Sequence, residues 1–350
     1  MTFPTASAFN PHAARRRTLV AGAAALAASA ALPSLAHTPP ALAASRLAPG
    51  EQKPLTIVVP FPPGGRSGWL AQRMAVGLDA VLGETITVEH RTGDVMTRMR
   101  EFARSAPDGR TLLLAMVRLP RRGVFTHDPE NAVVDSLVPI TVVARDPMVL
   151  VMAESRAAEL GIRSVADLLR HARRHPGRLT MASGIDGSTS EQASELFKTR
   201  SRTYITRIAA AGLTPDAEAV LGGRIDLLFA TLHTARSSIR SRELRALAVT
   251  SGAQFPLPGL ERLGTPTPVP LLQSVAPFAG VEVYDYSALY APHGTPPDVA
   301  DRLQQACTTV LSDTAVRNLL LTNNALPGGI TRAEFAQLEL AEERRWRQAR

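Results

Sequence analysis

"TIVVPFPPGGRSGWLAQRM", residues 56–74, joins a strand-like apolar run to an amphipathic helix through two prolines and two glycines. The prolines stiffen the chain where it leaves the strand, and the glycines allow backbone angles that other residues avoid. We expect the helix to begin near Ser67, where its first backbone N–H groups have no partner within the helix. A carboxylate or phosphate can accept hydrogen bonds from such groups. This stretch therefore predicts a strand–turn–helix unit with an anion-binding end.

A similar unit recurs in "MASGIDGSTSEQASELF", residues 181–197. The chain passes through Gly184 and Gly187 into a helix whose first residues, Ser188 to Glu191, fit the capping-box pattern S-x-x-E. If the two units face each other, both helix beginnings can hold one anion; the alternative is that both are ordinary turns of an α/β protein. Neither loop matches the nucleotide-binding patterns G-x-x-x-x-G-K-[ST] or G-x-G-x-x-G, which argues against a nucleotide ligand.

Apolar runs alternate with helical patterns along the whole chain, which predicts an α/β fold. The expected strands are at 55–60, 85–90, 111–116, 140–152, 178–183, 204–209, 224–230, 244–251 and 286–292. The expected helices are at 68–82, 95–105, 164–175, 190–200, 214–221, 296–323 and 331–349, and a proline-rich connector is expected at 256–280.

The run at 140–152 is long enough to leave one sheet and enter another, and the strand at 286–292 returns. This arrangement predicts two lobes that face a cleft: one made of residues 45–150 and 278–350, the other of residues 151–277. The crossings near 146–152 and 275–285 would act as hinges. Ligands of such folds bind beyond the carboxyl ends of the strands.

Residues 1–44 resemble an export signal. Arg15, Arg16 and Arg17 precede an alanine-rich apolar run, and cleavage sites are expected near residue 36 or 44. The Arg16-Arg17-Thr-Leu-Val order favours the twin-arginine route over the general secretory route. The apolar run is shorter than the ~20 residues of a membrane-spanning helix. We therefore expect a cleaved signal peptide and a protein free in the periplasm.

The composition of the remaining chain favours neither an enzyme nor a nucleic-acid partner. Its 36 basic and 31 acidic residues are interspersed. Only His171 and His175 share a helical face, where neighbouring arginines would repel a metal ion. Ser188 lacks the G-x-S-x-G elbow, which leaves a hydrolase as a weaker alternative. We expect no catalytic residue, cofactor or metal site, and we place the single cysteine, Cys307, in the core; Trp69 is expected in the core or as a pocket wall.

Seven motifs, in this order, resemble the solute-binding proteins of the tripartite tricarboxylate transporters, the Bug family. They are "PLTIVVPFPPGG", "LGETITVEHRTG", "APDGRTLLLAM", "GSTSEQASELFK", "AVLGGRIDLLFA", "LRALAVTS" and "LYAPHGTPPDVADRLQQA", and they cover nearly all of the chain after residue 53. The resemblance implies a two-lobed periplasmic binding protein of the type II, Venus-flytrap kind, with two mixed sheets flanked by helices. It also implies that the two strand–turn–helix loops bind a small carboxylate.

On this resemblance the ligand-binding residues come from the two loops. They are Phe61, Pro63, Gly64, Gly65, Arg66, Ser67, Gly68, Ser183, Gly187, Ser188, Thr189 and Ser190. The chain departs from the family pattern at Gly68, where the family has an acidic residue, and at Glu191, where the family often has histidine. Arg66 and Arg98 are basic residues new to the expected cleft, where they could pair with a second carboxylate of the ligand or serve an exposed structural role.

The function expected from the resemblance is a monomeric periplasmic receptor that delivers a mono- or dicarboxylate to the membrane subunits of a tripartite transporter. The alternative is a ligand-sensing regulatory protein that signals to a membrane sensor kinase.

Overall fold

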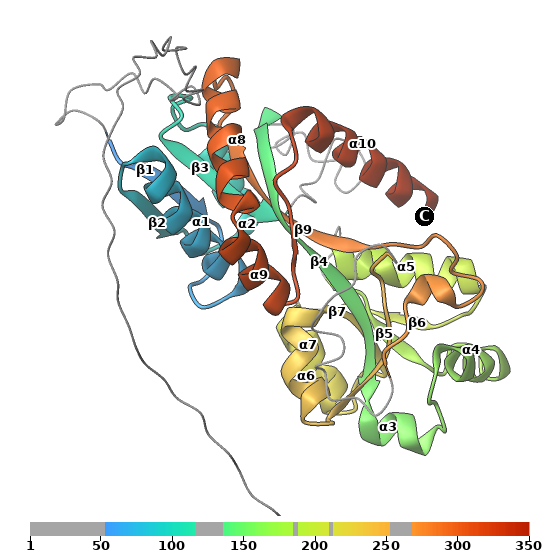
Figure 1. Ribbon diagram of the computed structural model, residues 1–350. Helices are drawn as coiled ribbons and strands as arrows, with labels where there is room; N and C mark the ends of the chain where they lie inside the picture. Colours follow the sequence, from blue (N-terminus) through green and yellow to red (C-terminus); the bar gives the residue numbers. More distant parts are fainter. Residues whose placement is uncertain (1–52, 117–135, 185–187, 210–212, 253–267, 350) are drawn as a thin grey trace, which may run out of the picture. The chain divides into compact units, whose positions relative to one another are not determined.

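A computed structural model of the chain describes residues 53–116, 136–184, 188–209, 213–252 and 268–349 (Figure 1). The predicted signal peptide, Gly187 and residues 256–267 of the predicted connector at 256–280 lie outside these residues. From Gln52 onward the chain forms one compact unit. Among the described residues no helix is both long and apolar enough to cross a bilayer.

The first half of this unit is a parallel βαβαβ arrangement, as predicted. Its elements are β1 (Leu55–Val59), α1 (Arg66–Leu82), β2 (Ile86–His90), α2 (Val95–Ala103) and β3 (Thr111–Met116). β1 pairs in parallel with both β2 and β3. Helix α1 begins at Arg66, one residue before the predicted Ser67 and two before the predicted range 68–82, because Gly65 already has the extended conformation of an N-cap.

A single long strand, β4 (Val138–Ala153), carries the chain from the first half into the second. Its residues up to Pro147 pair with β9 (Tyr284–Ala291), whereas Met148 and the residues after it pair with β7 and β8. The predicted passage of residues 140–152 from one sheet to another is therefore confirmed. Thr250 fixes the crossing point, because its hydroxyl bonds to the backbone of both Met148 and Val283.

The second half repeats the alternation of helices and strands. Its elements are α3 (Glu154–Glu159), α4 (Val165–Arg174), β5 (Thr180–Ala182), α5 (Thr189–Ser201), β6 (Thr206–Ile208), α6 (Leu213–Leu221), β7 (Leu227–Thr231), α7 (Leu232–Arg240) and β8 (Leu244–Val249). The strand order through both halves is β2-β1-β3-β9-β4-β7-β5-β6, with β8 and the short β10 (Leu326–Pro327) also on β4. Each half contains parallel and antiparallel pairs, so the predicted mixed sheets are present.

After the short 3₁₀ helix η3 (Leu272–Ser274) and β9, the C-terminal segment forms α8 (Pro297–Ser312), α9 (Thr314–Thr322) and α10 (Arg332–Ala349). Helix α8 packs on α1 of the first half, whereas α10 contacts both β4 and α5 of the second half. The predicted single helix over 296–323 is wrong. Asp313 has an extended backbone and accepts a hydrogen bond from the backbone N–H of Val316, so it ends one helix and caps the next.

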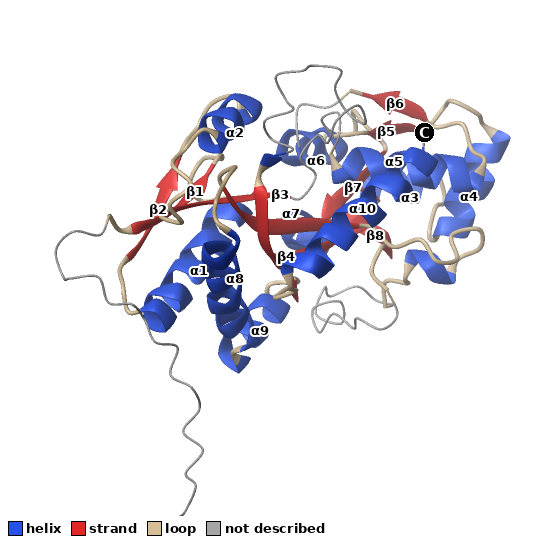
Figure 2. Cartoon of the chain, turned by 90° about the horizontal axis from the view of Figure 1, so that it is seen from above, coloured by secondary structure: helices blue, strands red, loops and turns tan. Residues whose placement is uncertain are grey.

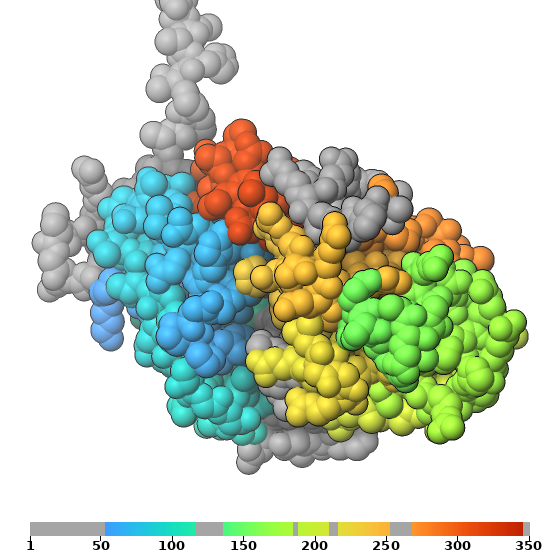
Figure 3. Space-filling view, turned by 90° about the horizontal axis from the view of Figure 1, so that it is seen from below, coloured from blue at the N-terminus to red at the C-terminus, as the bar shows by residue number. Residues whose placement is uncertain are grey.

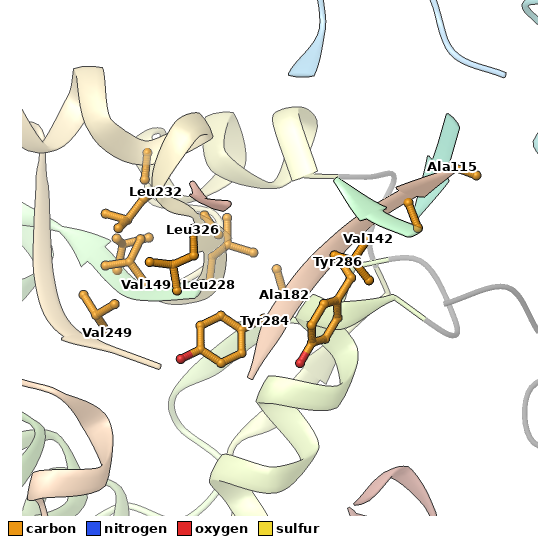
Figure 4. Close-up of a cluster of buried hydrophobic side chains, with 14 of the residues drawn as sticks. Ala115, Val142, Val149, Ala182, Leu228, Leu232, Val249, Tyr284, Tyr286 and Leu326 are labelled. Atoms are coloured by element: carbon orange, nitrogen blue, oxygen red, sulfur yellow. The ribbon is translucent and has the colours of Figure 1, made fainter. Parts of the chain in front are cut away.

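Among the described residues, three clusters of buried hydrophobic side chains join the helices to the strands. Alternate residues of β4 point to opposite faces: Met148, Leu150 and Met152 join the cluster beneath α4 and α5, while Val149 and Val151 join the cluster that contains residues of α6 and α7. The latter cluster also takes in Val142 and Ala115, so it runs from one half to the other (Figure 4). The third cluster lies between α1, α8 and the first sheet, and it contains Cys307, which confirms its predicted core position.

Candidate ligand-binding site

The first loop is open at the beginning of α1. Residues Pro62 to Gly65 are exposed, and Gly64 has a φ of +88°, a conformation that favours glycine. No side chain among the described residues caps the helix: its N-cap is Gly65, whose carbonyl accepts the first helical hydrogen bond from the N–H of Trp69 at 3.1 Å. The backbone N–H groups of the first helical turn therefore meet no capping side chain, as the sequence predicts.

His90 fixes this loop from the end of β2. Its Nδ1 lies 2.9 Å from the carbonyl oxygen of Phe61, and its ring packs against Gly68. A Cβ atom on Gly68 would lie 2.7 Å from His90 Cε1. The glycine at the family's acidic position thus leaves room for the imidazole, and the predicted contact residues Phe61 and Gly68 are held by it.

Arg66, the first residue of α1, lies on the Trp69 ring, with its Cζ 4.9 Å from the ring centroid. Its Nη2 donates to Asp146 Oδ1 at 2.7 Å, and the arginine side chain is only 15% exposed. The Nε and Nη1 atoms are buried and have no hydrogen-bond partner among the described residues. The Arg66 guanidinium therefore has N–H groups whose hydrogen-bonding capacity is not used by the described residues.

Asp146 belongs to β4 and sits opposite Asp285 of β9 in the antiparallel register. The pKa of Asp146 is raised to about 6, first by burial and also by the charge of Asp285, against the attraction of Arg66. Asp285 in turn accepts a hydrogen bond from Thr189 Oγ1 at 2.9 Å. The first residues of α1 and α5 thus meet at one pair of aspartates on the crossing strands.

The second loop is more closed than the first. Ser188 caps α5, with its hydroxyl oxygen 3.2 Å from the N–H of Glu191, and Ser190 donates to the Phe229 carbonyl at 2.8 Å. Ser183 is buried and directs its hydroxyl to the carbonyl of Gly184 at 3.2 Å. Since these hydroxyls and that of Thr189 have internal partners, a ligand would have to replace one of these bonds or use the backbone N–H groups.

The two aspartates and the neighbouring His233 were not among the predicted site residues. Asp146 lay in the predicted strand 140–152, and both aspartates fell in the crossings predicted as hinges, 146–152 and 275–285, without a role in binding.

His233 lies at the start of α7, and its pKa is lowered. Partial burial is the largest cause, the charge of Arg66 is the second, and the charge of Arg236 is the third. One sequence feature could have indicated His233. Thr231 ends β7 and caps α7, so this segment is a strand followed directly by a helix, as in the two predicted loops but without glycine.

Gln192 is a further polar group in this region. It is fully buried, and neither atom of its side-chain amide has a hydrogen-bond partner among the described residues. It follows Thr189 by three residues on α5, so the two side chains are neighbours on one helix face.

Arg98, the second basic residue assigned to the cleft, has a local role. It pairs with Glu101 on its own helix and donates to the Thr92 carbonyl at 3.0 Å. Trp69 is half-buried against the core of the first half. The described residues contain no group of three histidine, cysteine or acidic side chains that could hold a metal ion.

A cavity of about 380 Å³ lies elsewhere, between α3 and the starts of β5 and β7. It is lined by Ser155, Arg156, Glu159, Thr180, Gly223, Arg224 and Asp226. Since β5 and β7 are parallel, their starts lie at the sheet edge opposite the second loop. Asp226 bonds to both Arg156 and Thr180, which gives this polar cluster a structural role.

Two α/β halves joined by crossing strands, with two helix beginnings at the crossing, define the class of periplasmic solute-binding proteins. Residues 70–348 match the family model TctC, described as "Tripartite tricarboxylate transporter family receptor". The chain therefore belongs to the family of tripartite tricarboxylate transporter receptors, as the seven motifs predict.

Curated relatives and solved structures agree with this assignment. Protein BugT of Bordetella pertussis is 29% identical over 301 residues, which covers 84% of this chain and 87% of BugT. The structure "R. palustris Rpa4515 with adipate" is 26% identical with a TM-score of 0.72, covering 86% of this chain and 97% of that one. MatC from Rhodopseudomonas palustris with bound malate has the same fold, at 22% identity and a TM-score of 0.65, with 85% of this chain and 98% of MatC covered.

Proposed function

We propose that this receptor binds a small dicarboxylate where the first turns of α1 and α5 meet the Asp146–Asp285 pair. The observation that carries the proposal is Arg66, whose Nε and Nη1 are buried and unpartnered among the described residues. One carboxylate of the ligand accepts from the uncapped backbone N–H groups after Gly65, and the other accepts from Arg66. The adipate and malate named for the two R. palustris proteins support this ligand class.

The second loop closes the site from the other half. Its contribution comes from Ser183, Gly187 and Ser188 to Ser190, through backbone N–H groups at the start of α5 rather than through hydroxyls already bonded within the protein. Gln192 adds an unpartnered amide on the same helix face as Thr189. Ligand contacts to both halves would favour the closed arrangement of the lobes formed by residues 45–150 with 278–350 and by residues 151–277.

The protein acts, on this proposal, as a monomeric periplasmic carrier exported by its N-terminal signal through the twin-arginine route, without catalysis or cofactor. Its partners are the ligand and the membrane subunits of a tripartite transporter. A bound acid should therefore be recovered chemically unchanged, which mass spectrometry of the released ligand can check.

The direct test compares adipate with hexanoate, which has the same number of carbon atoms and only one carboxylate. We expect adipate to raise the melting temperature of the protein. Arg66→Gln should weaken adipate binding about 10- to 100-fold, the loss typical of a charge-assisted hydrogen bond, and change hexanoate binding much less. Calorimetric titration measures both affinities.

Arg98→Gln is the matched control, because Arg98 is paired with Glu101 outside the site. The double variant Arg66→Gln/Asp146→Asn keeps a neutral hydrogen-bonded pair and separates the loss of a ligand contact from the exposure of an unpaired buried aspartate. A flat melting response to adipate, malate and hexanoate would contradict the ligand class. If Arg66→Gln weakened the binding of adipate and hexanoate equally, the assigned role of Arg66 would be wrong, but the ligand class would stand.

A further inference from the structure

The C-terminal ends of α4 and α5, and the turns that follow them, carry six exposed arginines. This basic face comprises Arg170, Arg173, Arg174, Arg178, Arg200 and Arg202. It is independent of the proposed ligand site: α5 has 13 residues, and its two ends are about 20 Å apart at 1.5 Å per residue.

Two contacts join the segments of the basic face. Arg173 Nη2 donates to the Ser201 carbonyl at 3.3 Å, and the N–H of Gly177 donates to the Tyr204 carbonyl at 2.8 Å. Figure 2 shows α4 beside α5, and Figure 3 shows residues of about 155–180, in green and yellow-green, at the surface. The arginines of both segments therefore belong to one surface.

Most of this positive charge is not neutralised by the protein. Arg170 pairs with Asp167, and the nearby Glu195 pairs with Lys198. Arg173 donates to a carbonyl, as described above. The remaining four arginines of the basic face form no ion pair with any residue that the structure describes; they are Arg174, Arg178, Arg200 and Arg202. Like charges gathered on one surface repel one another and attract anionic partners.

Tyr204 adds an apolar group to the basic face. It is 70% exposed, and its ring lies against Gly177, where an added Cβ would be 3.0 Å from Tyr204 Cε1. An aromatic ring with a polar tip suits the boundary between water and acyl chains.

We propose that the basic face binds the surface of a membrane that contains anionic phospholipids. Several unpaired arginines on one surface match a dense layer of phosphate groups, and each arginine near such a surface strengthens binding about fivefold. Tyr204 would enter the headgroup region between the arginines. This contact would hold the receptor close to the membrane without using its ligand site.

The test is co-sedimentation of the full mature chain with vesicles made of equal parts phosphatidylglycerol and phosphatidylcholine. We expect binding to these vesicles, little binding to vesicles of phosphatidylcholine alone, and loss of binding at about 1 M salt, where the Debye length is ~3 Å. Replacing Arg174, Arg178 and Arg200 together by glutamine should weaken binding about 100-fold. Tyr204→Ser should weaken it further.

Arg202→Gly separates binding from folding. Arg202 has a φ of +51° at the end of α5, where glycine is favoured, so this variant should melt at the same or a higher temperature while binding vesicles about fivefold more weakly. Arg242→Gly is its matched control: Arg242 is also exposed with a φ of +62°, but it follows α7, outside the basic face. Adipate binding should be unchanged in both variants.

Equal binding to the two kinds of vesicle would overturn the proposal, as would equal losses in Arg202→Gly and Arg242→Gly. Retention by native membrane vesicles but not by protein-free phosphatidylglycerol vesicles would also overturn it, because the partner would then be a membrane protein.

Discussion

The beginnings of α1 and α5 follow the same strand–turn–helix plan but are finished in opposite ways. At α1 the N-cap is a glycine, the part of the chain that the structure describes supplies no capping side chain, and the loop is exposed. At α5 the N-cap is Ser188, its hydroxyl serves Glu191, and the hydroxyls of the next two residues bond to Asp285 and Phe229. One helix beginning is thus free to accept an anion, whereas the other is largely occupied by the protein.

This difference assigns ligand binding to the beginning of α1 and structural stability to the beginning of α5. An open helix end with a neighbouring unpartnered guanidinium can change its partners when a ligand arrives. A capped end that bonds to β7 and β9 instead fixes the second loop relative to the crossing strands. We therefore expect substitutions at α1 to act on ligand affinity and substitutions at α5 to act mainly on stability.

The largest expected effect is a pH dependence of the unfolding free energy that is caused by the Asp146 carboxyl group. Its pKa is raised from 3.8 to about 6 in the folded protein, so the folded state binds the proton more tightly than the unfolded state. The associated stabilisation is fully present below about pH 4 and is lost as the pH rises through about 6, a change of about 3 kcal/mol. Urea unfolding of the ligand-free protein across this range measures it.

Asp146→Asn supplies the control for this effect. The variant cannot take up the proton, so the difference in unfolding free energy between the two proteins should vary with pH by the same amount. A constant difference between about pH 4 and 7 would show that Asp146 is charged throughout, held so by Arg66. The open helix end would then carry a permanent ion pair.

The order of elements could be predicted from the sequence because it depends on local patterns. Pro-Pro-Gly-Gly marked the end of β1, and the apolar run at 140–152 was long enough to pair with two groups of strands. The break at Asp313 was missed because the apolar period continues across it, and α7 was missed because no turn residues separate it from β7.

The aspartate pair of the site could not be predicted in this way. Asp146 and Asp285 are neighbours only through the register of β4 and β9, which shifts twice at irregularities before Asp146. The fit of His90 against Gly68 likewise depends on the parallel register of β1 and β2. Such contacts depend on the register of strands that are distant in the sequence, and local patterns in a single sequence do not predict that register.

A smaller effect is expected from the cap of α5. Ser188→Ala removes the hydroxyl that accepts from Glu191 and should cost about 1 kcal/mol of unfolding free energy. Ser164→Ala, which removes the equivalent cap of α4, should cost a similar amount. If Ser188→Ala also reduced adipate affinity as strongly as Arg66→Gln does, the Ser188 hydroxyl would contact the ligand directly, and the contrast between the two helix beginnings would fail.

The smallest effect on stability comes from giving α1 the cap that it lacks. Gly65 has a φ of −84° and a ψ of 177°, which serine adopts readily, and a Cβ there would be 4.0 Å from the nearest atom outside its neighbours, the Pro62 carbonyl oxygen. Gly65→Ser should therefore raise the unfolding free energy by only a few tenths of a kcal/mol. Its hydroxyl would compete with the ligand for the first N–H groups of α1, so adipate affinity should fall although the protein is slightly more stable. Gly65→Ala, which adds the Cβ without the hydroxyl, should retain that affinity; equal affinities in the two variants would mean that the ligand does not use these N–H groups.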